Sequence, residues 1–382
     1  SNNEGYHAIS NFVDHDPEVP DMLLDYDCGE RSYDLASGYN HAGTDYFLWP
    51  FAWNKMDNDE VEVVAAADGV IVLKQDGNFD RSCSFGGIWN AVYVQHADGS
   101  VAWYGHLKNG SLTTKDVGTA VSTGDYLGVV GSSGSSTIPH LHFELYSNHD
   151  NLVDPYTGSC NSLNDASWWQ AQRPYYDSAI NKITTGLAAA DFATCPNPEI
   201  SSEAIFFAPD DTIYFTTFYR DQLIIQTSDY TIYRPDGSAF ASWSHNSNAD
   251  HYAASWWYWA YTLPANAAEG KWQFAVEFNG QQTTHDFYVG SPQAPEAVQY
   301  TTFANDTVDL YAYSGEHIAL LVPDANLNET AVTQLRLILD DAYTQYELIS
   351  GNTPEPPYQH NGLATIAVVP TPCGNSCAIS GQ

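Results

Sequence analysis

The chain has 382 residues, more than one hydrophobic core usually serves, so we expect two or three domains. Apolar residues make up 43% of the chain and aromatic residues 14%, which is enough for packed cores and excludes a largely disordered chain. The 47 acidic and 12 basic side chains give a formal net charge of −35. Because so acidic a surface repels phosphate backbones and anionic lipid heads, we expect no nucleic-acid partner.

The cysteines indicate an oxidising compartment. There are six, and no two of them form a Cys-x-x-Cys pair, which argues against zinc ribbons and redox motifs and favours disulfides in a secreted, extracellular protein. Several connectivities are possible, and we predict pairing between sequence neighbours, so that each disulfide lies within one domain. The predicted pairs are Cys28–Cys83, Cys160–Cys195 and Cys373–Cys377.

The first part of the chain alternates between short strands and turns. Residues 61–73 are rich in β-branched side chains and are interrupted by Asp68-Gly69, a dipeptide that predicts a hairpin turn. Two further strands, 91–96 and 101–104, flank a turn at 97–100, and a closing strand covers 140–146. These signals predict an antiparallel β-sheet domain, followed by weak helical character over 168–190.

The rest of the chain predicts two more domains. Between 200 and 289, short strands recur at a spacing typical of an immunoglobulin-like β-sandwich. A strand at 317–322, an amphipathic helix over 328–349 and a strand at 363–369 then predict a small α/β module. Because such a unit cannot easily bury both faces of its strands, we expect it to be incomplete or to pack on its neighbour.

We therefore predict a mainly β protein with three domains, and no run of residues is apolar and long enough to cross a membrane. The N-terminus has neither a basic nor an apolar signal region and resembles a mature end. The predicted domains cover residues 1–190, 196–291 and 296–382.

Three short motifs in the first domain suggest chemistry. In a strand, His140 and His142 share one face, a geometry suited to metal binding or acid–base work. His41 and Asp45, four residues apart around a glycine, can converge on one ion, and His106 ends a predicted strand. Each motif alone is commonly structural, and only their combination favours a site.

The combination suits zinc. Catalytic zinc sites use three nitrogen or oxygen ligands and keep one position open for water. Two histidines and one carboxylate leave a net positive charge on the metal, which lowers the pKa of water, and the other two histidines remain for acid–base catalysis.

Together the motifs resemble the lysostaphin-type (LytM-like) zinc metalloendopeptidases. That family carries His-x-x-x-Asp, then aromatic-x-His-Leu, then His-Leu-His-Phe-Glu, and all three are present at 41–45, 104–107 and 140–144. The segment 38–46 is closest to the β-lytic branch, and the resemblance covers roughly residues 20–160. It implies an antiparallel catalytic sheet and an endopeptidase activity.

Carried over residue by residue, the resemblance implies one Zn²⁺ held by His41, Asp45 and His142. His140 would take a proton from water and His106 would steady the oxyanion, although the two roles could be shared or exchanged. The chain departs from the family at Ile138, where the family commonly has glycine before Pro-His. Ile138 is therefore expected to narrow the cleft or to shift its loop.

Several alternatives stay open at this point. The family resemblance implies a peptide substrate, either peptidoglycan cross-links or Gly-rich extracellular proteins such as elastin; a degenerate relative that only binds wall or protein is the alternative. Glu144 is either a partner of an imidazole or a solvated charge. The aromatic run 255–261 is either a stacking platform or a packing surface. The oligomeric state is not predicted.

Overall fold

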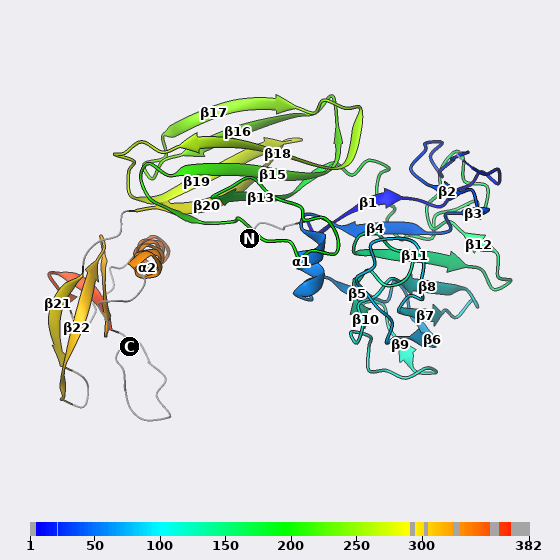
Figure 1. Ribbon diagram of the computed structural model, residues 1–382, viewed down its shortest axis with the longest axis horizontal. Helices are drawn as coiled ribbons and strands as arrows, with labels where there is room; N and C mark the ends of the chain where they lie inside the picture. Colours follow the sequence, from blue (N-terminus) through cyan, green and yellow to red (C-terminus); the bar gives the residue numbers. More distant parts are fainter. Residues whose placement is uncertain are drawn as a thin grey trace.

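The computed structural model describes residues 5–20, 22–290, 295–301, 305–323, 329–351 and 359–367. Strands, paired mainly antiparallel, far outnumber the two helices among these residues, which confirms the mainly β prediction. Figure 1 shows a large sheet at one end of the molecule, a two-sheet sandwich in the middle and a small α/β module at the other end.

An eight-stranded antiparallel sheet forms the first part of the molecule. Its strands, in spatial order, are β1 (His7–Asn11), β4 (Thr44–Leu48), β11 (His140–Tyr146), β8 (Val101–Gly105), β7 (Ala91–Gln95), β6 (Gly69–Gln75) and β9 (Ala120–Val121), with β12 (Leu152–Val153) beside β11. Smaller elements surround it, namely α1 (Ala52–Asp57) and the pairs β2 (Asp34–Leu35) with β3 (Tyr39–Asn40) and β5 (Glu62–Val64) with β10 (Tyr126–Val129).

Strand β11 separates a polar face from an apolar core. Leu141, Phe143 and Leu145 pack against the hydrophobic core of this domain, as the alternation of a strand requires. His140 and His142 lie on the opposite face, as predicted. The sheet therefore presents its histidines on one side while its other side holds the domain together.

One of the two predicted hairpins forms. Strands β7 and β8 pair directly, with Gln95 opposite Val101. The hairpin expected at Asp68-Gly69 is wrong, because β5 pairs with β10 and β6 pairs with β7 and β9.

The middle of the molecule is a sandwich of two sheets. The three-stranded sheet has the order β13 (Ala179–Gly186), β15 (Thr212–Leu223) and β18 (His251–Thr262); the five-stranded sheet has the order β14 (Phe206–Phe207), β20 (Gln281–Val289), β19 (Gly270–Phe278), β16 (Thr227–Tyr233) and β17 (Ala239–Asn246). Buried side chains from both sheets, among them Phe215 and Phe274, form one core. The immunoglobulin-like relationship stays a prediction.

The helical tendency expected over residues 168–190 is wrong. Residues 179–186 form β13, which pairs with β15 of the sandwich. Ile180, Ile183 and two adjacent threonines favour a strand here, and the long edge of β15 supplies a partner. We therefore propose that the boundary of the first domain lies before β13 rather than at residue 190.

The C-terminal module combines a five-stranded sheet with one long helix. Its strands have the order β21 (Glu296–Thr301), β22 (Thr307–Ser314), β23 (Ile318–Val322), β25 (Leu363–Ala367) and β24 (Gln359–His360), and the helix is α2 (Glu329–Ser350). Val332 and Leu339 of α2 pack on Leu320 and Val322, while Asp341 forms an ion pair with Lys271 of the sandwich at 2.8 Å. Neither helix of the described residues has both the length and the apolar character to span a membrane.

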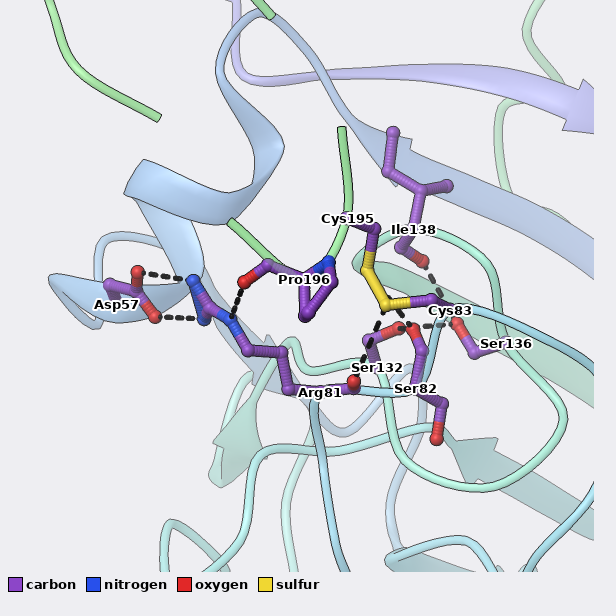
Figure 2. The surroundings of a disulfide bond; sticks show 9 residues. All are labelled: Asp57, Arg81, Ser82, Cys83, Ser132, Ser136, Ile138, Cys195 and Pro196. Carbon is purple, nitrogen blue, oxygen red and sulfur yellow. Dashed lines mark hydrogen bonds and ion pairs between the residues drawn. A yellow bond between two sulfur atoms is a disulfide. The ribbon is translucent and has the colours of Figure 1, made fainter. Parts of the chain in front are cut away.

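The disulfides correct the predicted pairing. Cys28 bonds to Cys160 and Cys83 bonds to Cys195, whereas Cys373 and Cys377 lie outside the described residues. The predicted pairs Cys28–Cys83 and Cys160–Cys195 are wrong because the fold, and not distance along the chain, decides which loops meet. The second bond fastens the connection between β13 and β14 of the sandwich to a loop of the first domain (Figure 2).

Candidate active site

Strand register brings the predicted site residues together. Asp45 of β4 lies directly opposite His142 of β11, and Gly105 of β8 lies opposite His142 on the other side. His106 follows Gly105 and His41 precedes β4 by three residues. Three neighbouring strands thus place all five predicted side chains on one face of the sheet.

Three of these side chains form a compact donor set. The Nε2 atom of His41 lies 3.1 Å from Asp45 Oδ2, and Nδ1 of His142 lies 2.7 Å from Asp45 Oδ1. The two imidazole nitrogens are 3.3 Å apart, and all three side chains are buried. Two nitrogens and a carboxylate that converge in this way have the chemistry of a zinc site.

Contacts outside the donor set fix the orientation of both rings. Nδ1 of His41 hydrogen-bonds to the main-chain carbonyl of Phe12 at 2.7 Å, which leaves the Nε2 lone pair toward the cluster. Nε2 of His142 lies 2.7 Å from Glu144 Oε1, and the Tyr146 hydroxyl donates to Glu144 Oε2. Glu144 is therefore a buried partner of an imidazole, and not a solvated charge.

Two contributors to the site carried no signal in the sequence. The side-chain amide of Asn11 donates to Asp45 Oδ2 at 3.1 Å, and Phe12 contributes only its main-chain carbonyl. An isolated asparagine and a carbonyl have no distinctive pattern. Both lie more than 25 residues from Asp45, so only the pairing of β1 with β4 reveals them.

The loop between His41 and Asp45 passes very close to β11, and Gly43 makes this possible. A Cβ atom at position 43 would lie 2.7 Å from the main-chain oxygen of Phe143 and 2.8 Å from Nε2 of His142. A real Cβ atom does not approach backbone this closely, so only glycine fits. The predicted turn around a glycine thus has a steric cause.

His106 and His140 form a second pair beside the donor set, with ring centroids 4.4 Å apart. Nδ1 of His106 hydrogen-bonds to the carbonyl of Ser133 at 2.6 Å, and Nδ1 of His140 to the carbonyl of Ile138 at 2.8 Å. Since a carbonyl only accepts, each Nδ1 carries the proton and each Nε2 offers a lone pair. His106 also has a φ of 61°, a left-handed conformation that is uncommon outside glycine and often marks functional positions.

The electrostatics of the cluster favour a bound cation. Burial opposes a charge on His142, yet its hydrogen bonds to Asp45 and Glu144 raise its pKa to about 10. Burial would also raise the pKa of Asp45, but the adjacent His41 and His140 hold it well below its usual range. Two buried carboxylates beside one imidazole therefore stabilise a positive charge between them. A divalent metal ion can supply this charge in place of a proton.

The second pair of histidines is kept neutral. Burial lowers the pKa of His106 well below its usual value, and the neighbouring His140 and His142 lower it further. Burial also lowers the pKa of His140 more than the Asp45 carboxylate raises it. Both rings are thus available to accept a proton.

A cleft of about 530 Å³ leads to this cluster. Its lining includes His106, His142 and Glu144, and the aromatic and aliphatic side chains of Tyr33, Tyr39, Phe85, Ile88 and Trp89. Ser135 also lines the cleft, whereas Ser132 and Ser133 are fully buried. The Ile138 side chain packs against the domain core and is absent from the cleft lining, so it does not narrow the cleft as expected.

Comparison with protein-family models gives a match for this chain. Residues 50–155 match the model of peptidase family M23. The first part of this chain is therefore similar to M23 peptidases over 106 of its 382 residues. The matched range contains His106, His140 and His142, while His41 and Asp45 lie just before it.

Three of the curated relatives are named as endopeptidases, one of them the peptidoglycan DD-endopeptidase ShyC of Vibrio cholerae, which is 31% identical over 28% of this chain and 20% of its own. The chain is 43% identical over 82 residues to the DD-carboxypeptidase/endopeptidase Mpg of Neisseria meningitidis, a match over 22% of this chain and 16% of the relative. It is 34% identical over 113 residues to the glycyl-glycine endopeptidase ALE-1 of Staphylococcus capitis, over 29% and 26% of the two chains. The chain thus spans well under a third of the length of each.

Among solved structures, the catalytic domain of lysostaphin from Staphylococcus simulans is 29% identical. That match covers 32% of this chain and 83% of the lysostaphin chain, with a TM-score of 0.24.

Proposed function

We propose that this protein is a zinc-dependent endopeptidase that holds one Zn²⁺ with His41, Asp45 and His142 and uses His106 and His140 for proton transfer. The observation that carries the proposal is the convergence of these five buried side chains in one cluster, of which His106 and His142 line a cleft. All five positions hold a residue type that can bind zinc or transfer a proton. This argues against a degenerate relative that only binds wall or protein.

The donor set fits the metal. In each of the two ligating imidazoles, the ring nitrogen that faces away from the metal site contacts a carbonyl or a carboxylate. This arrangement orients metal-ligating histidines. When bound, zinc supplies Lewis acidity, which polarises a peptide carbonyl and makes a water molecule more acidic. A metal site of three protein ligands keeps room for water and substrate.

The two remaining histidines share the proton work. Because both Nδ1–H groups are committed to carbonyls, His106 and His140 begin as proton acceptors at Nε2. Either ring can donate to a developing oxyanion or to a leaving amine only after it has taken a proton. We therefore propose that His140 accepts the proton of the attacking water, and that His106 assists once it is charged.

The cleft favours internal peptide bonds of neutral segments. Its rim is aromatic and aliphatic, the Glu144 carboxylate lines it, and the Asp45 carboxylate contacts the lining residue His142. A terminal carboxylate would be repelled there, whereas a backbone with small side chains can lie along the rings. We propose peptidoglycan cross-links as substrates, in agreement with the names of the relatives, with Gly-rich extracellular proteins such as elastin as the second candidate.

The cellular location follows from the same proposal. Two disulfides suit an oxidising compartment, and a cell-wall substrate lies outside the cytoplasmic membrane. We propose that the protein works in an extracellular or periplasmic space.

A combined metal and activity measurement tests the proposal. The purified protein should contain one zinc per chain and should digest purified peptidoglycan; a chelator should abolish hydrolysis and added zinc should restore it. Elastin and a pentaglycine peptide are digested in parallel to rank the substrates. Zinc binding with no hydrolysis of any of them, combined with retention on wall material, would instead establish a binding module.

A further inference from the structure

A path of hydrogen bonds links His140 to the loop that carries Cys83. Figure 2 shows the part of it from Ser136 through Ser132 to Ser82. We propose that Ser136 is a positioning residue for His140, and that Ser132 and the disulfide-anchored segment 81–84 hold Ser136 in place. The inference rests on the proposed function, in which His140 accepts a proton.

Ser136 lies against the ring nitrogen that faces away from the metal ligands. Its Oγ atom is 3.2 Å from Nδ1 of His140, which also contacts the Ile138 carbonyl at 2.8 Å. The Ser136 side chain is only 2% exposed, so water does not compete for this contact. Two acceptors instead of one hold the plane of the imidazole.

Two acceptors face the Ser136 hydroxyl. Ser132 Oγ lies 2.9 Å from the main-chain oxygen of Ser82, to which it donates because a carbonyl only accepts. Ser132 Oγ is therefore free to accept from Ser136, 2.7 Å away. The Ile138 carbonyl, 3.0 Å from Ser136 Oγ, can accept from Ser136 as well as from His140, since a carbonyl oxygen has two lone pairs.

The consequence concerns the tautomer of His140. Since the Ser136 proton is directed to Ser132 or to the Ile138 carbonyl, Ser136 offers only a lone pair to Nδ1 of His140. The imidazole proton then stays on Nδ1, and Nε2, which lies 3.5 Å from Asp45 Oδ1, keeps its lone pair.

The far end of the path is anchored from outside the site. The amide of Ser82 donates to the Ser132 carbonyl at 2.9 Å, and bridges join Arg81 to Ser132 and Ser84 to Ser136. Between these bridges, Cys83 is bonded to Cys195. The two loops therefore move as one unit.

Arg81 strengthens this anchor. Its guanidinium contacts both carboxylate oxygens of Asp57, at 2.7 and 2.9 Å, and its Nε donates to the carbonyl of Pro196 at 3.2 Å (Figure 2). A bidentate pair of this kind fixes both position and orientation. The support of Ser136 thus includes the connection between β13 and β14 of the sandwich.

Kinetics of serine variants test the inference in the full chain. Ser136→Ala should lower kcat about tenfold and change KM by less than about twofold, since ring orientation is lost while the cleft is kept. Ser136→Thr retains the hydroxyl and should restore most of kcat. The matched control is Ser82→Ala, because only main-chain groups of Ser82 take part in the path.

Two measurements that do not need activity separate this inference from the proposed function. Zinc content should be the same in the wild type and in Ser136→Ala. In ¹⁵N spectra of the zinc-loaded protein, the Nδ1 proton of His140 should exchange slowly, and it should exchange faster in Ser136→Ala than in Ser82→Ala. An inactive wild type would refute the proposed function and leave the spectra to decide the inference.

The positioning role is overturned by either of two results. One is a kcat for Ser136→Ala equal to that of the wild type together with unchanged exchange of the His140 proton. The other is a decrease in kcat for Ser136→Thr as large as that for Ser136→Ala. That result would indicate that Ser136 contributes by packing and that its hydroxyl has no role.

Discussion

His142 touches two carboxylates at once, one through each ring nitrogen. Asp45 faces Nδ1 and Glu144 faces Nε2, both at 2.7 Å. The Glu144 contact orients the ring and makes its nitrogen a stronger donor toward a metal. Glu144 should therefore matter for metal affinity although it lies outside the donor set.

Glu144→Gln should weaken zinc binding about tenfold or more, because the amide lacks the charge that supports His142. A competition titration with a chromophoric chelator measures the change. Tyr146→Phe is the matched control, since it removes only the hydroxyl that donates to Glu144 and should have a smaller effect. Equal zinc affinity in Glu144→Gln and wild type would contradict the role given to Glu144.

His106 and His142 should respond differently to truncation. We expect His142→Ala to lose zinc and hydrolysis together, and His106→Ala to retain zinc while kcat falls on the order of 10²-fold or more. Metal analysis beside steady-state kinetics distinguishes the two. Full activity in either variant is incompatible with the proposed assignment.

At this scale, the sequence identified the side chains better than their surroundings. Ion-binding residue types at close spacing marked His41, Asp45 and the pair on β11. The acceptors that set each tautomer could not be found in this way, because main-chain carbonyls such as those of Phe12 and Ser133 leave no residue-type signature. Whether Glu144 was buried also depended on the finished sheet.

At the level of elements, the strand alternation of β11 decides which side chains form the site. This alternation is local and could be read from sequence, as could the β7–β8 hairpin. The partner of β5 could not, since Asp68-Gly69 allows a hairpin that competes with pairing to the distant β10. The main-chain hydrogen bond from Ala65 to Asp125 shows that the long-range partner prevails.

Gly43→Ala tests the close approach of the loop to β11. The added Cβ would press on the main-chain oxygen of Phe143 and should cost about 1–3 kcal/mol of stability and displace Asp45, which lowers zinc affinity. Thermal unfolding with and without zinc measures both effects. In the control Gly128→Ala, the new Cβ meets the end of the flexible Leu107 side chain at 3.2 Å and should be tolerated better.

On the scale of the whole molecule, the first domain and the sandwich share a charged interface. Asp221 of the sandwich pairs with Arg31 of the first domain at 3.0 Å, and the indole of Trp49 donates to the Tyr219 carbonyl. These contacts join residues far apart in sequence. The boundary between the first domain and the sandwich could not be read from the sequence. It depends on the pairing of β13 with β15, which only the folded sandwich shows.

His7, close to this interface, should make stability depend on pH. Burial, followed by the charges of Arg173 and Arg220, lowers its pKa from 6.5 to about 4. Below pH 6.5 the unfolded chain binds a proton that the folded chain rejects, so stability should fall by about 3 kcal/mol as the pH drops from 6.5 to 4.

Denaturant unfolding at several pH values measures this slope. His7→Phe should flatten it, and salt at about 0.5 M should change it little, because burial is the main cause and is not screened. A slope that is the same in His7→Phe and the wild type would show that other groups dominate.

The two disulfides overlap along the chain, from Cys28 to Cys160 and from Cys83 to Cys195. A single cut of the backbone anywhere between residues 29 and 194 would therefore leave both fragments covalently attached. Such a nicked molecule would run as one band on a gel without reductant and as two bands after reduction. Damage by proteolysis in these loops would thus be retained within one particle, with the sheet and its cluster of histidines still assembled.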